Sequence, residues 1–342
     1  MRNILFIFLL SYASIQCSSE KKLSVKDYEA ALPVYMEQIE AASLKTHLYI
    51  FASDEFEGRA TGEAGQIKAA NYIRDFYVKN NIVSPKSPFV TNYSQTIPEN
   101  TFPRVKKPTD NILGFIQGSE KPEEILVVSA HYDHVGMKNG VIYNGADDDG
   151  SGSVALLEMA KAFKQAEKDG FSPKRSILFL HFTGEELGLL GSKYYTDYQP
   201  VFPLENTIAN LNIDMIGRVD DVHLNDPNYV YIIGSDRLSS DLHRISELSN
   251  EQHTQMTLDY TYNSTNDPNQ FYYRSDHYNF AKNNIPVIFY FNGVHEDYHQ
   301  PGDTPDKINY EILAKRTQLI FATAWYLANA TTRPLVDKTP EK

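Results

Sequence analysis

Short apolar runs alternate with segments of helical periodicity along most of this chain, and this alternation constrains its fold more than any other feature. The runs SILFLHF (176–182) and PVIFYF (286–291) are apolar almost throughout, as in strands that are buried on both faces of a sheet. Residues 64–80 and 153–168 carry apolar side chains at helical spacing. We therefore predict a three-layer α/β sandwich with a mostly parallel, twisted central sheet flanked by helices.

The same two periodicities predict the remaining elements. Strands are expected at 111–117, 125–129, 207–213 and 229–233, and helices at 24–50, 187–195, 238–251, 277–283 and 310–328. Residues 84–108 are rich in proline and lysine and should form an irregular connection. No second alternation pattern indicates another domain, so we expect one domain over residues 24–332 and a disordered tail over residues 333–342.

The first residues have the pattern of a secretory signal, because Arg2 precedes an apolar run (Ile4–Leu10) that is too short to span a bilayer. The small residues around Ala13 fit ordinary signal cleavage. Alternatively, Cys17 is the lipid-modified first residue of a bacterial lipoprotein, although the residues before it make a poor lipobox. We expect residues 1–17 to be a signal peptide of the lipoprotein type, and the protein to be exported. It would then be anchored in the cell envelope through Cys17, on the periplasmic side or in the outer membrane, or be secreted.

Charge and cysteine content limit the possible partners and metal sites. The net charge of −12 opposes binding to a phosphate backbone, so nucleic acid is not an expected partner. A single cysteine allows no internal disulfide and no thiolate-rich zinc site. Any metal must therefore be held by histidine, aspartate and glutamate.

Such residues follow the predicted strands. The strand at 125–129 leads into AHYDH and then GADDDGSG (145–152), and the strand at 176–182 leads into TGEE. Asp214 follows the strand at 207–213, and a loop with Tyr298-His299 follows the last strand. Because ligands of such sheets collect at the carboxyl ends of the strands, we expect these side chains to converge.

Each group has a simpler explanation when it is considered alone. A histidine beside an acid is commonly a surface pair, the aspartate triplet could be a solvated turn, and Glu185-Glu186 could begin a helix. Asp214 is harder to explain in this way, because a carboxylate inside the apolar segment NLNIDMIG needs a partner. The occurrence of all these groups at strand ends favours a metal site.

Two zinc ions fit this set of residues. Zinc accepts imidazole and carboxylate ligands, and two ions about 3.5–4 Å apart need one bridging carboxylate and two terminal ligands each. One bridging aspartate, two histidines and two further acids meet that count. In the pair Glu185-Glu186, one side chain would bind metal. Glu185 would be the general base that takes the proton of a water molecule and returns it to the leaving amine.

Taken in order, these motifs resemble those of the M28 family of zinc aminopeptidases. The shared motifs are HYD (131–133), residues 145–152, EE (185–186), NIDM (212–215) and YH (298–299). The segments 48–73 and RSDH (274–277) are also similar to parts of bacterial members, and the resemblance covers residues 44–330. It implies a zinc-dependent exopeptidase-like fold, peptide substrates and two Zn²⁺ ions per chain.

The resemblance also implies a role for each ligand candidate. Asp148, the middle residue of the aspartate triplet, matches the bridging ligand. His131 and Asp214 would complete one zinc site, and Glu186 and His299 would complete the other.

Three further expectations follow from the same resemblance. Asp133 matches an acid that orients the first histidine. The peptide bond between Asp148 and Asp149 is expected to be cis. Tyr298 matches a tyrosine that donates to the oxyanion in some members, although a packing role explains this ring equally well.

Other functions on the same fold stay open. The segment between Phe76 and Asn111 is too short for a protease-associated insert, which favours a compact aminopeptidase that removes N-terminal residues from peptides. The alternatives are a glutaminyl-peptide cyclotransferase, which usually uses one zinc, a non-catalytic binding protein, and a carboxypeptidase, for which Arg218 and Arg274 could bind the terminal carboxylate. Residues 258–273 form either a lid over the first substrate side chain or an ordinary surface loop. Residue preference, peptide length, native metal and oligomeric state stay open.

Overall fold

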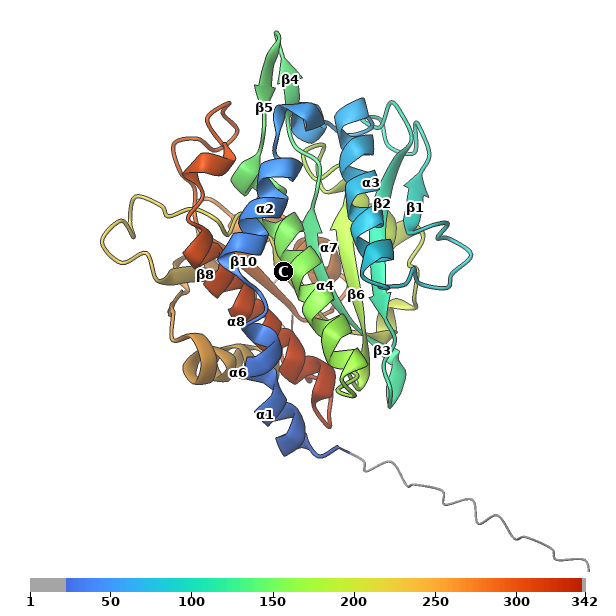
Figure 1. The fold of residues 1–342 in the computed structure, drawn as a ribbon, viewed down its shortest axis with the longest axis vertical. Helices are drawn as coiled ribbons and strands as arrows, with labels where there is room; N and C mark the ends of the chain where they lie inside the picture. The colour runs from blue at the N-terminus through green and yellow to red at the C-terminus, as the bar shows by residue number, and fades with distance from the viewer. Residues whose placement is uncertain (1–22, 340–342) are drawn as a thin grey trace, which may run out of the picture.

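The computed structural model describes residues 23–339 of the chain (Figure 1). The predicted signal peptide, with Cys17, lies outside these residues. No helix among the described residues combines the length and the apolar character that a membrane crossing requires.

A mixed sheet of eight strands forms the middle layer, which confirms the predicted fold class. Its strand order is β1 (Ser94–Ile97), β2 (Thr109–Ile116), β6 (Arg175–Phe182), β3 (Lys121–His131), β7 (Thr207–Ile213), β10 (Val287–Phe291), β8 (Tyr229–Ile233) and β9 (Thr257–Asp259). The four central strands β6, β3, β7 and β10 are parallel neighbours. The strands β2 and β8, which flank them, pair antiparallel. The carboxyl ends of the four central strands therefore lie at the same edge.

Helices cover both faces of this sheet. One cluster of buried side chains joins the sheet to α1 (Val25–Met36), α2 (Ala41–Phe51), α3 (Ala64–Lys79), α4 (Gly152–Lys168), α6 (Ser240–Ser249) and α8 (Tyr310–Asn329). The other face carries α7 (His277–Ala281) with the loops around it, and α5 (Leu190–Lys193) packs against α7 and contributes Leu190 to a third, smaller cluster. Alternate residues of β3 belong to opposite clusters: Leu126 and Val128 to the first, Ile125 and Val127 to the second. This explains why the central strands are apolar throughout.

The structure differs from the predicted elements in a few places. The helix expected at 24–50 is two helices, α1 and α2, with the buried side chain of Ile39 between them. The connection at 84–108 contains the short strand β1, and only Leu190–Lys193 of the helix predicted at 187–195 is regular α-helix. A hairpin of β4 (Gly136–Lys138) and β5 (Val141–Tyr143) projects from one end of the molecule (Figure 1). Strands of three residues are too short to show an alternating pattern.

Part of the tail that was expected to be disordered lies against α6. The backbone N–H of Leu335 donates to the carboxylate of Asp241. The N–H of Asp337 donates to the carbonyl of Leu238, and its carboxylate accepts from the N–H of Ser240. Residues 335–337 are therefore tied to the start of this helix.

Candidate metal centre

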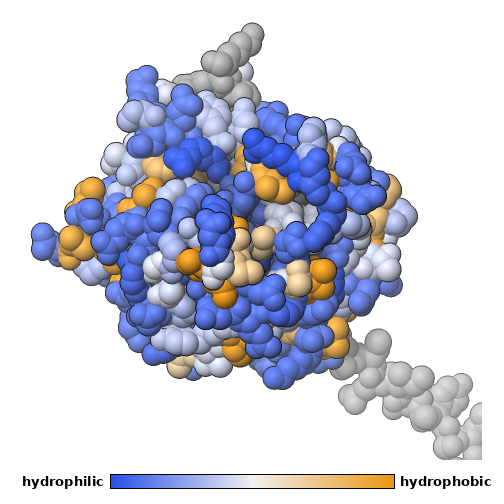
Figure 2. All heavy atoms as spheres, turned by 90° about the horizontal axis from the view of Figure 1, so that it is seen from above, coloured by the Kyte–Doolittle hydropathy of each residue, from blue (hydrophilic) through white to orange (hydrophobic). Residues whose placement is uncertain are grey.

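The predicted ligands gather at the carboxyl edge of the parallel strands. His131 is the last residue of β3, and Asp214 comes directly after β7. Glu186 lies in the loop after β6, and His299 lies in the loop after β10. This edge faces the β4–β5 hairpin, and Figure 2 looks onto it: the surface is mostly hydrophilic, with scattered apolar residues.

The turn at 145–152 separates the three aspartates by function. Asp147 accepts from the N–H of Gly217 at 2.6 Å. Asp149 accepts from the N–H groups of His131 at 3.2 Å and Met215 at 3.1 Å. These two carboxylates hold backbone, and Asp147 also pairs with His295 at 3.1 Å, whereas the carboxylate of Asp148 faces His131, His134 and His299. The peptide bond between Asp148 and Asp149 is cis, as expected.

Gly145 allows this turn to close. Its φ is +56°, and a Cβ at this position would lie 2.3 Å from the carbonyl oxygen of Asp148 and 2.4 Å from the ring of His134. Any side chain at this position would therefore displace the turn or the histidine ring.

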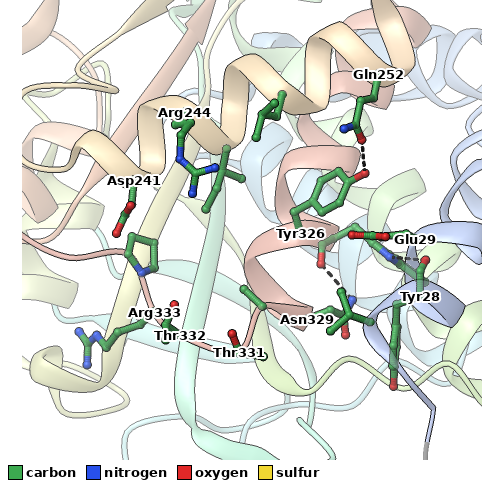
Figure 3. A pocket seen from close by; sticks show the side chains of 16 residues that line it. Tyr28, Glu29, Asp241, Arg244, Gln252, Tyr326, Asn329, Thr331, Thr332 and Arg333 are labelled. Carbon is green, nitrogen blue, oxygen red and sulfur yellow. Dashed lines mark hydrogen bonds between the residues drawn. The ribbon is translucent and has the colours of Figure 1, made fainter.

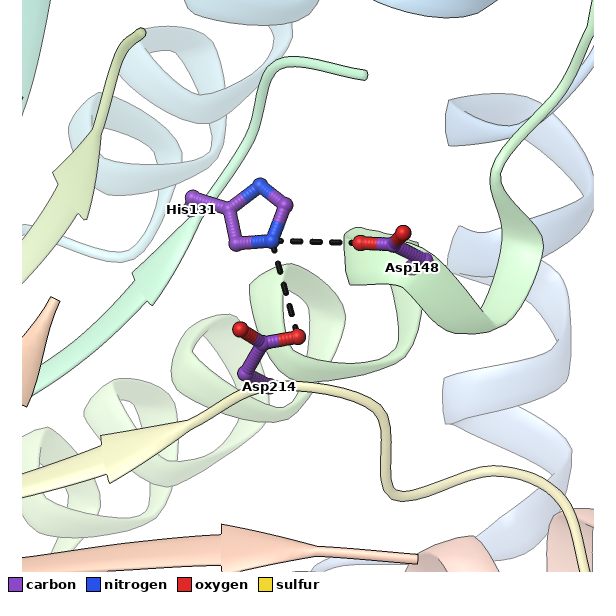
Figure 4. Close-up of side chains that lie close together, drawn as sticks. All are labelled: His131, Asp148 and Asp214. Carbon is purple, nitrogen blue, oxygen red and sulfur yellow. Dashed lines mark ion pairs between the residues drawn. The ribbon is translucent and has the colours of Figure 1, made fainter. Parts of the chain in front are cut away.

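Three of the predicted ligands form a first group around one point (Figure 4). The Nε2 atom of His131 lies 3.2 Å from Oδ1 of Asp148 and 3.6 Å from Oδ1 of Asp214. Ligand atoms of all three residues lie within 4.8 Å of one another, and all three side chains are buried. One imidazole and two carboxylates at this spacing match the ligands that zinc accepts.

A second group shares Asp148 and contains a residue that sequence reasoning missed. The Nδ1 atom of His134 lies 2.9 Å from Oε1 of Glu186 and 3.7 Å from Oδ2 of Asp148. The predicted ligand His299 is also present, with Nε2 at 2.9 Å from Oδ2 of Asp148 and 3.4 Å from Oε1 of Glu186. The second group thus contains two imidazoles. The sequence did contain a signal for His134, because it follows His131 by three residues and therefore lies at the same carboxyl edge of the sheet.

Buried polar atoms without hydrogen-bond partners indicate that the two groups of side chains bind cations. Nε2 of His131, Oδ2 of Asp148 and Oε1 of Glu186 are buried, and none has a hydrogen-bond partner among the described residues. A buried polar atom without a partner costs about 1–3 kcal/mol. Three such atoms in the two groups are explained if metal ions accept their lone pairs, so the residues fit zinc.

Neighbouring residues fix the orientation of the first group. Nδ1 of His131 lies 3.0 Å from the backbone carbonyl oxygen of Asp133, whose carboxylate is 3.8 Å away. The ring is therefore oriented mainly by the backbone of Asp133. The hydroxyl of Ser275 donates to Oδ2 of Asp214 at 2.6 Å, which leaves Oδ1 to face His131.

Glu185 belongs to neither group. Its backbone N–H donates to the carboxylate of Asp133 at 3.2 Å, which ties the loop after β6 to the segment that follows His131. Burial raises the pKa of Glu185 well above its ordinary value, and the charges of Asp214, Asp276 and Glu186 add to that effect. This carboxyl group lines a pocket together with Asp148 and Asp214, which is the position that a proton carrier needs.

Arg59 supports both groups from behind and was also missed. Its guanidinium is fully buried and donates to the carbonyls of Tyr132 at 2.9 Å, Asn144 at 2.6 Å and Gly145 at 2.8 Å. It also reaches the carbonyl of Phe51 at the end of α2 at 3.2 Å. It joins the segment after His131 to the turn that carries Asp148. The sequence gives no signal of this, because the residues that Arg59 contacts are distant in the chain.

A pocket opens beside Glu185 and the ligands. Its apolar wall consists of Met215, Phe271, Phe289 and Phe291, and its polar wall contains Arg274 and Tyr298. The ring of Tyr298 stacks on that of His299 with centroids 4.0 Å apart. Phe271 comes from the segment 258–273, so one end of that segment lines the pocket.

A larger cavity of about 360 Å³ lies elsewhere, between α1, α6 and the end of α8 (Figure 3). Arg244 of α6 and Tyr326 of α8 line it, and its wall contains no histidine. Figure 1 places α1 at the end of the molecule opposite the β4–β5 hairpin. The cavity is thus separate from the two groups.

Proteins of similar sequence include peptidases. The model of peptidase family M28 matches residues 111–324. Aminopeptidase YwaD of Bacillus subtilis is 28% identical over 247 residues, which are 68% of this chain and 48% of that protein. The chain spans about half the length of the first curated relatives that it matches.

Solved structures show the same fold at low sequence identity. The Legionella pneumophila LapA aminopeptidase has a TM-score of 0.68 at 20% identity, covering 97% of this chain and 81% of its own. The Porphyromonas gingivalis glutaminyl cyclase has a TM-score of 0.65 at 17% identity, covering 83% and 97%. Because a peptidase and a cyclase share this fold, the fold alone does not choose between them.

Proposed function

The chain belongs to peptidase family M28, and we propose that it is a two-zinc aminopeptidase that removes N-terminal residues from peptides. The observation that carries this proposal is that the carboxylate of Asp148 faces His131 with one oxygen and His299 with the other, so that two groups of potential ligands share it. A pair of metal ions requires a carboxylate that bridges them, whereas a site for one ion requires no bridging carboxylate. This favours a peptidase over a one-zinc cyclotransferase.

The chain has enough ligands for both ions. His131 and Asp214 would hold one ion together with Asp148, and Glu186 and His299 would hold the other. His134 lies against Glu186 and would orient that carboxylate. When bound, zinc would polarise the scissile carbonyl and lower the pKa of the attacking water.

Glu185 would move the proton. It lines the pocket beside Asp148 and Asp214 without belonging to either ligand group. It would take the proton of the attacking water, and the departing amine would then receive that proton from the same carboxyl group.

The arginines favour an aminopeptidase over a carboxypeptidase. Of the two candidates for a carboxylate-binding cluster, Arg218 places both terminal nitrogens 3.1 Å from one oxygen of Asp297 and is therefore neutralised. Only Arg274 faces the pocket. A single arginine does not make a cluster.

The decisive experiment combines a chelator with blocked substrates. The zinc-loaded protein should hydrolyse leucine p-nitroanilide and C-terminally amidated peptides, but not N-acetylated ones, and chelation should abolish activity. Glu185→Gln should lower kcat by roughly 10²–10⁴-fold and keep two zinc ions. Glu247→Gln, at a half-exposed carboxylate on α6, is the matched control and should leave kcat unchanged. Cleavage of N-acetylated peptides, or conversion of N-terminal glutamine to a lactam, would replace this proposal by one of the alternatives.

We also propose that the protein is exported and held at the membrane by a lipid on Cys17. The support is the sequence of residues 1–17 alone. Cys17→Ser should move the protein from the membrane fraction to the soluble fraction of the cell envelope. An unchanged distribution would contradict the lipid anchor and leave the peptidase proposal intact.

A further inference from the structure

Arg274 is the cation of the candidate substrate pocket. It lines the same wall as Tyr298, and Asp148 and Glu185 contribute to the same pocket. The next residue, Ser275, is buried and donates to Asp214 at 2.6 Å. The backbone at Arg274 is therefore fixed relative to the ligand groups by a direct contact.

Two contacts hold the side chain of Arg274 in place. Its guanidinium carbon lies 4.7 Å from the centre of the Phe271 ring, and one terminal nitrogen donates to the hydroxyl of Tyr298 at 3.4 Å. A guanidinium has five N–H donors in a planar fork, so most of its donors are unused. The side chain is pre-oriented by an aromatic face, yet open to solvent on the other side.

No carboxylate neutralises this guanidinium within residues 23–339. Arg218 and Arg74 are paired with Asp297 and Asp110, and the buried Arg59 and Arg316 donate to backbone carbonyls instead. An arginine that is oriented, unpaired and placed in a pocket beside the reacting groups has the geometry that binds a carboxylate through two parallel hydrogen bonds.

We propose that Arg274 binds a carboxylate of the substrate and makes the enzyme selective for peptides that present one at this wall of the pocket. The inference rests on the proposed aminopeptidase function. Two parts of a peptide supply this chemistry: an acidic side chain on the first residue, or the terminal carboxylate of a dipeptide. The apolar wall of Met215, Phe289 and Phe291 accommodates the aliphatic carbons in either case.

The test uses two pairs of substrates that differ in one carboxylate. The first pair is the p-nitroanilides of glutamate and glutamine, and the second is Leu-Gly and its C-terminal amide. In one pair at least, Arg274→Gln should lower kcat/KM for the carboxylate-bearing member by roughly 10- to 100-fold, the range of a charge-assisted hydrogen bond. The neutral member should change less than about twofold, and Arg274→Lys should restore part of the loss because the charge remains. The affected pair identifies the source of the carboxylate.

The chain offers a matched control. Arg237 also stacks on an aromatic ring, with its guanidinium carbon 4.0 Å from the centre of the Tyr272 ring, but it lines a different pocket. Arg237→Gln removes the same charge and should change neither pair. The preference for the carboxylate should also weaken as salt is raised, because Arg274 is exposed.

The outcomes separate the two proposals. If native enzyme cleaves neutral substrates and Arg274→Gln changes both members of both pairs equally, the assignment of Arg274 is wrong and the aminopeptidase stands. If zinc-loaded native enzyme cleaves none of the four substrates, the proposed function fails, and this inference fails with it.

Discussion

Replacing Arg59 with methionine tests whether the buried guanidinium holds the two ligand groups together. Three of its acceptors, the carbonyls of Phe51, Tyr132 and Asn144, have no other hydrogen-bond donor among the described residues. Each buried carbonyl that loses its donor costs about 1–3 kcal/mol. Burial lowers the pKa of Arg59 to about 10, although nearby aspartates partly oppose that shift. Replacing Arg59 with methionine therefore also removes the free-energy cost of burying the charged guanidinium. We expect a net loss of about 3 kcal/mol in the free energy of unfolding, from a total of about 5–15 kcal/mol.

The zinc affinity distinguishes a positioning role from mere stability. Arg175 is a matched control, because it is equally buried and donates to the carbonyls of Leu327 and Ala330 but lies at the opposite end of its strand from the ligand groups. Both Arg59→Met and Arg175→Met should lower the midpoint of urea denaturation. Only Arg59→Met should weaken zinc binding, by roughly 10–100-fold, as expected when a residue that orients ligands is lost.

The measurement is a zinc titration against a competing chelator, at a temperature at which both variants are folded. Equal zinc affinities in the two variants would refute the reasoning, because the hydrogen bonds of Arg59 would then stabilise the fold without positioning the ligands. Arg59→Lys should show an intermediate affinity, since one ammonium cannot reach all of the carbonyls.

Three further predictions concern single side chains. Tyr298→Phe should lower kcat roughly tenfold at unchanged zinc content if its hydroxyl donates to the oxyanion, and an unchanged kcat would assign the ring to packing on His299. Metal analysis should find one zinc per chain in His299→Ala, because a ligand is lost. It should find two in His134→Ala, with the zinc affinity of the second site lowered roughly 10–100-fold, because only a residue that orients Glu186 is lost. The reverse pattern would show that His134 is the ligand and His299 the orienting residue. Burial acts to raise the pKa of Glu158, but hydrogen bonds from His47 and other neighbours lower it below its ordinary value. Its contribution to stability is therefore present above the ordinary pKa and lost as the pH falls through the folded pKa, so Glu158→Gln should destabilise by about 2 kcal/mol at pH 7 and by progressively less below about pH 4 in urea melts. A difference that is constant with pH would contradict this.

The sequence predicted those site residues whose positions are determined by the ends of the sheet strands. His131 and Asp214 end adjacent parallel strands, so the periodicity that located the strands also located these side chains. The same reasoning located Glu185 and Glu186 in the loop after β6. Asp148 needed the family resemblance, because three adjacent aspartates differ only in where the turn points them.

The residues that were missed depend on contacts between distant segments. Arg59 binds carbonyls from three segments, and nothing in the amino acids that carry those carbonyls indicates a partner. His134 was overlooked because the ligand count was already complete without it. The β4–β5 hairpin after His134 has strands too short for a periodicity argument.

The hydroxyl of Ser275 that orients Asp214 is the end of a longer chain of buried hydrogen bonds. The amide of Asn210 donates to the hydroxyl of Ser129 at 2.8 Å, and that hydroxyl donates to the amide oxygen of Asn212 at 2.7 Å. The nitrogen of Asn212 in turn donates to Ser275 at 2.9 Å. All of these side chains are buried among apolar residues.

This chain of polar groups specifies strand register. In a sheet that is apolar on both faces, β7 could slide along β3 by one residue and still bury aliphatic side chains. The slide would place Leu211 where the asparagines now meet Ser129 and would leave several amides in the core without partners, at about 1–3 kcal/mol each. The buried polar side chains thereby fix the register of β7 against β3. This register determines where β7 ends and therefore where Asp214 lies relative to His131.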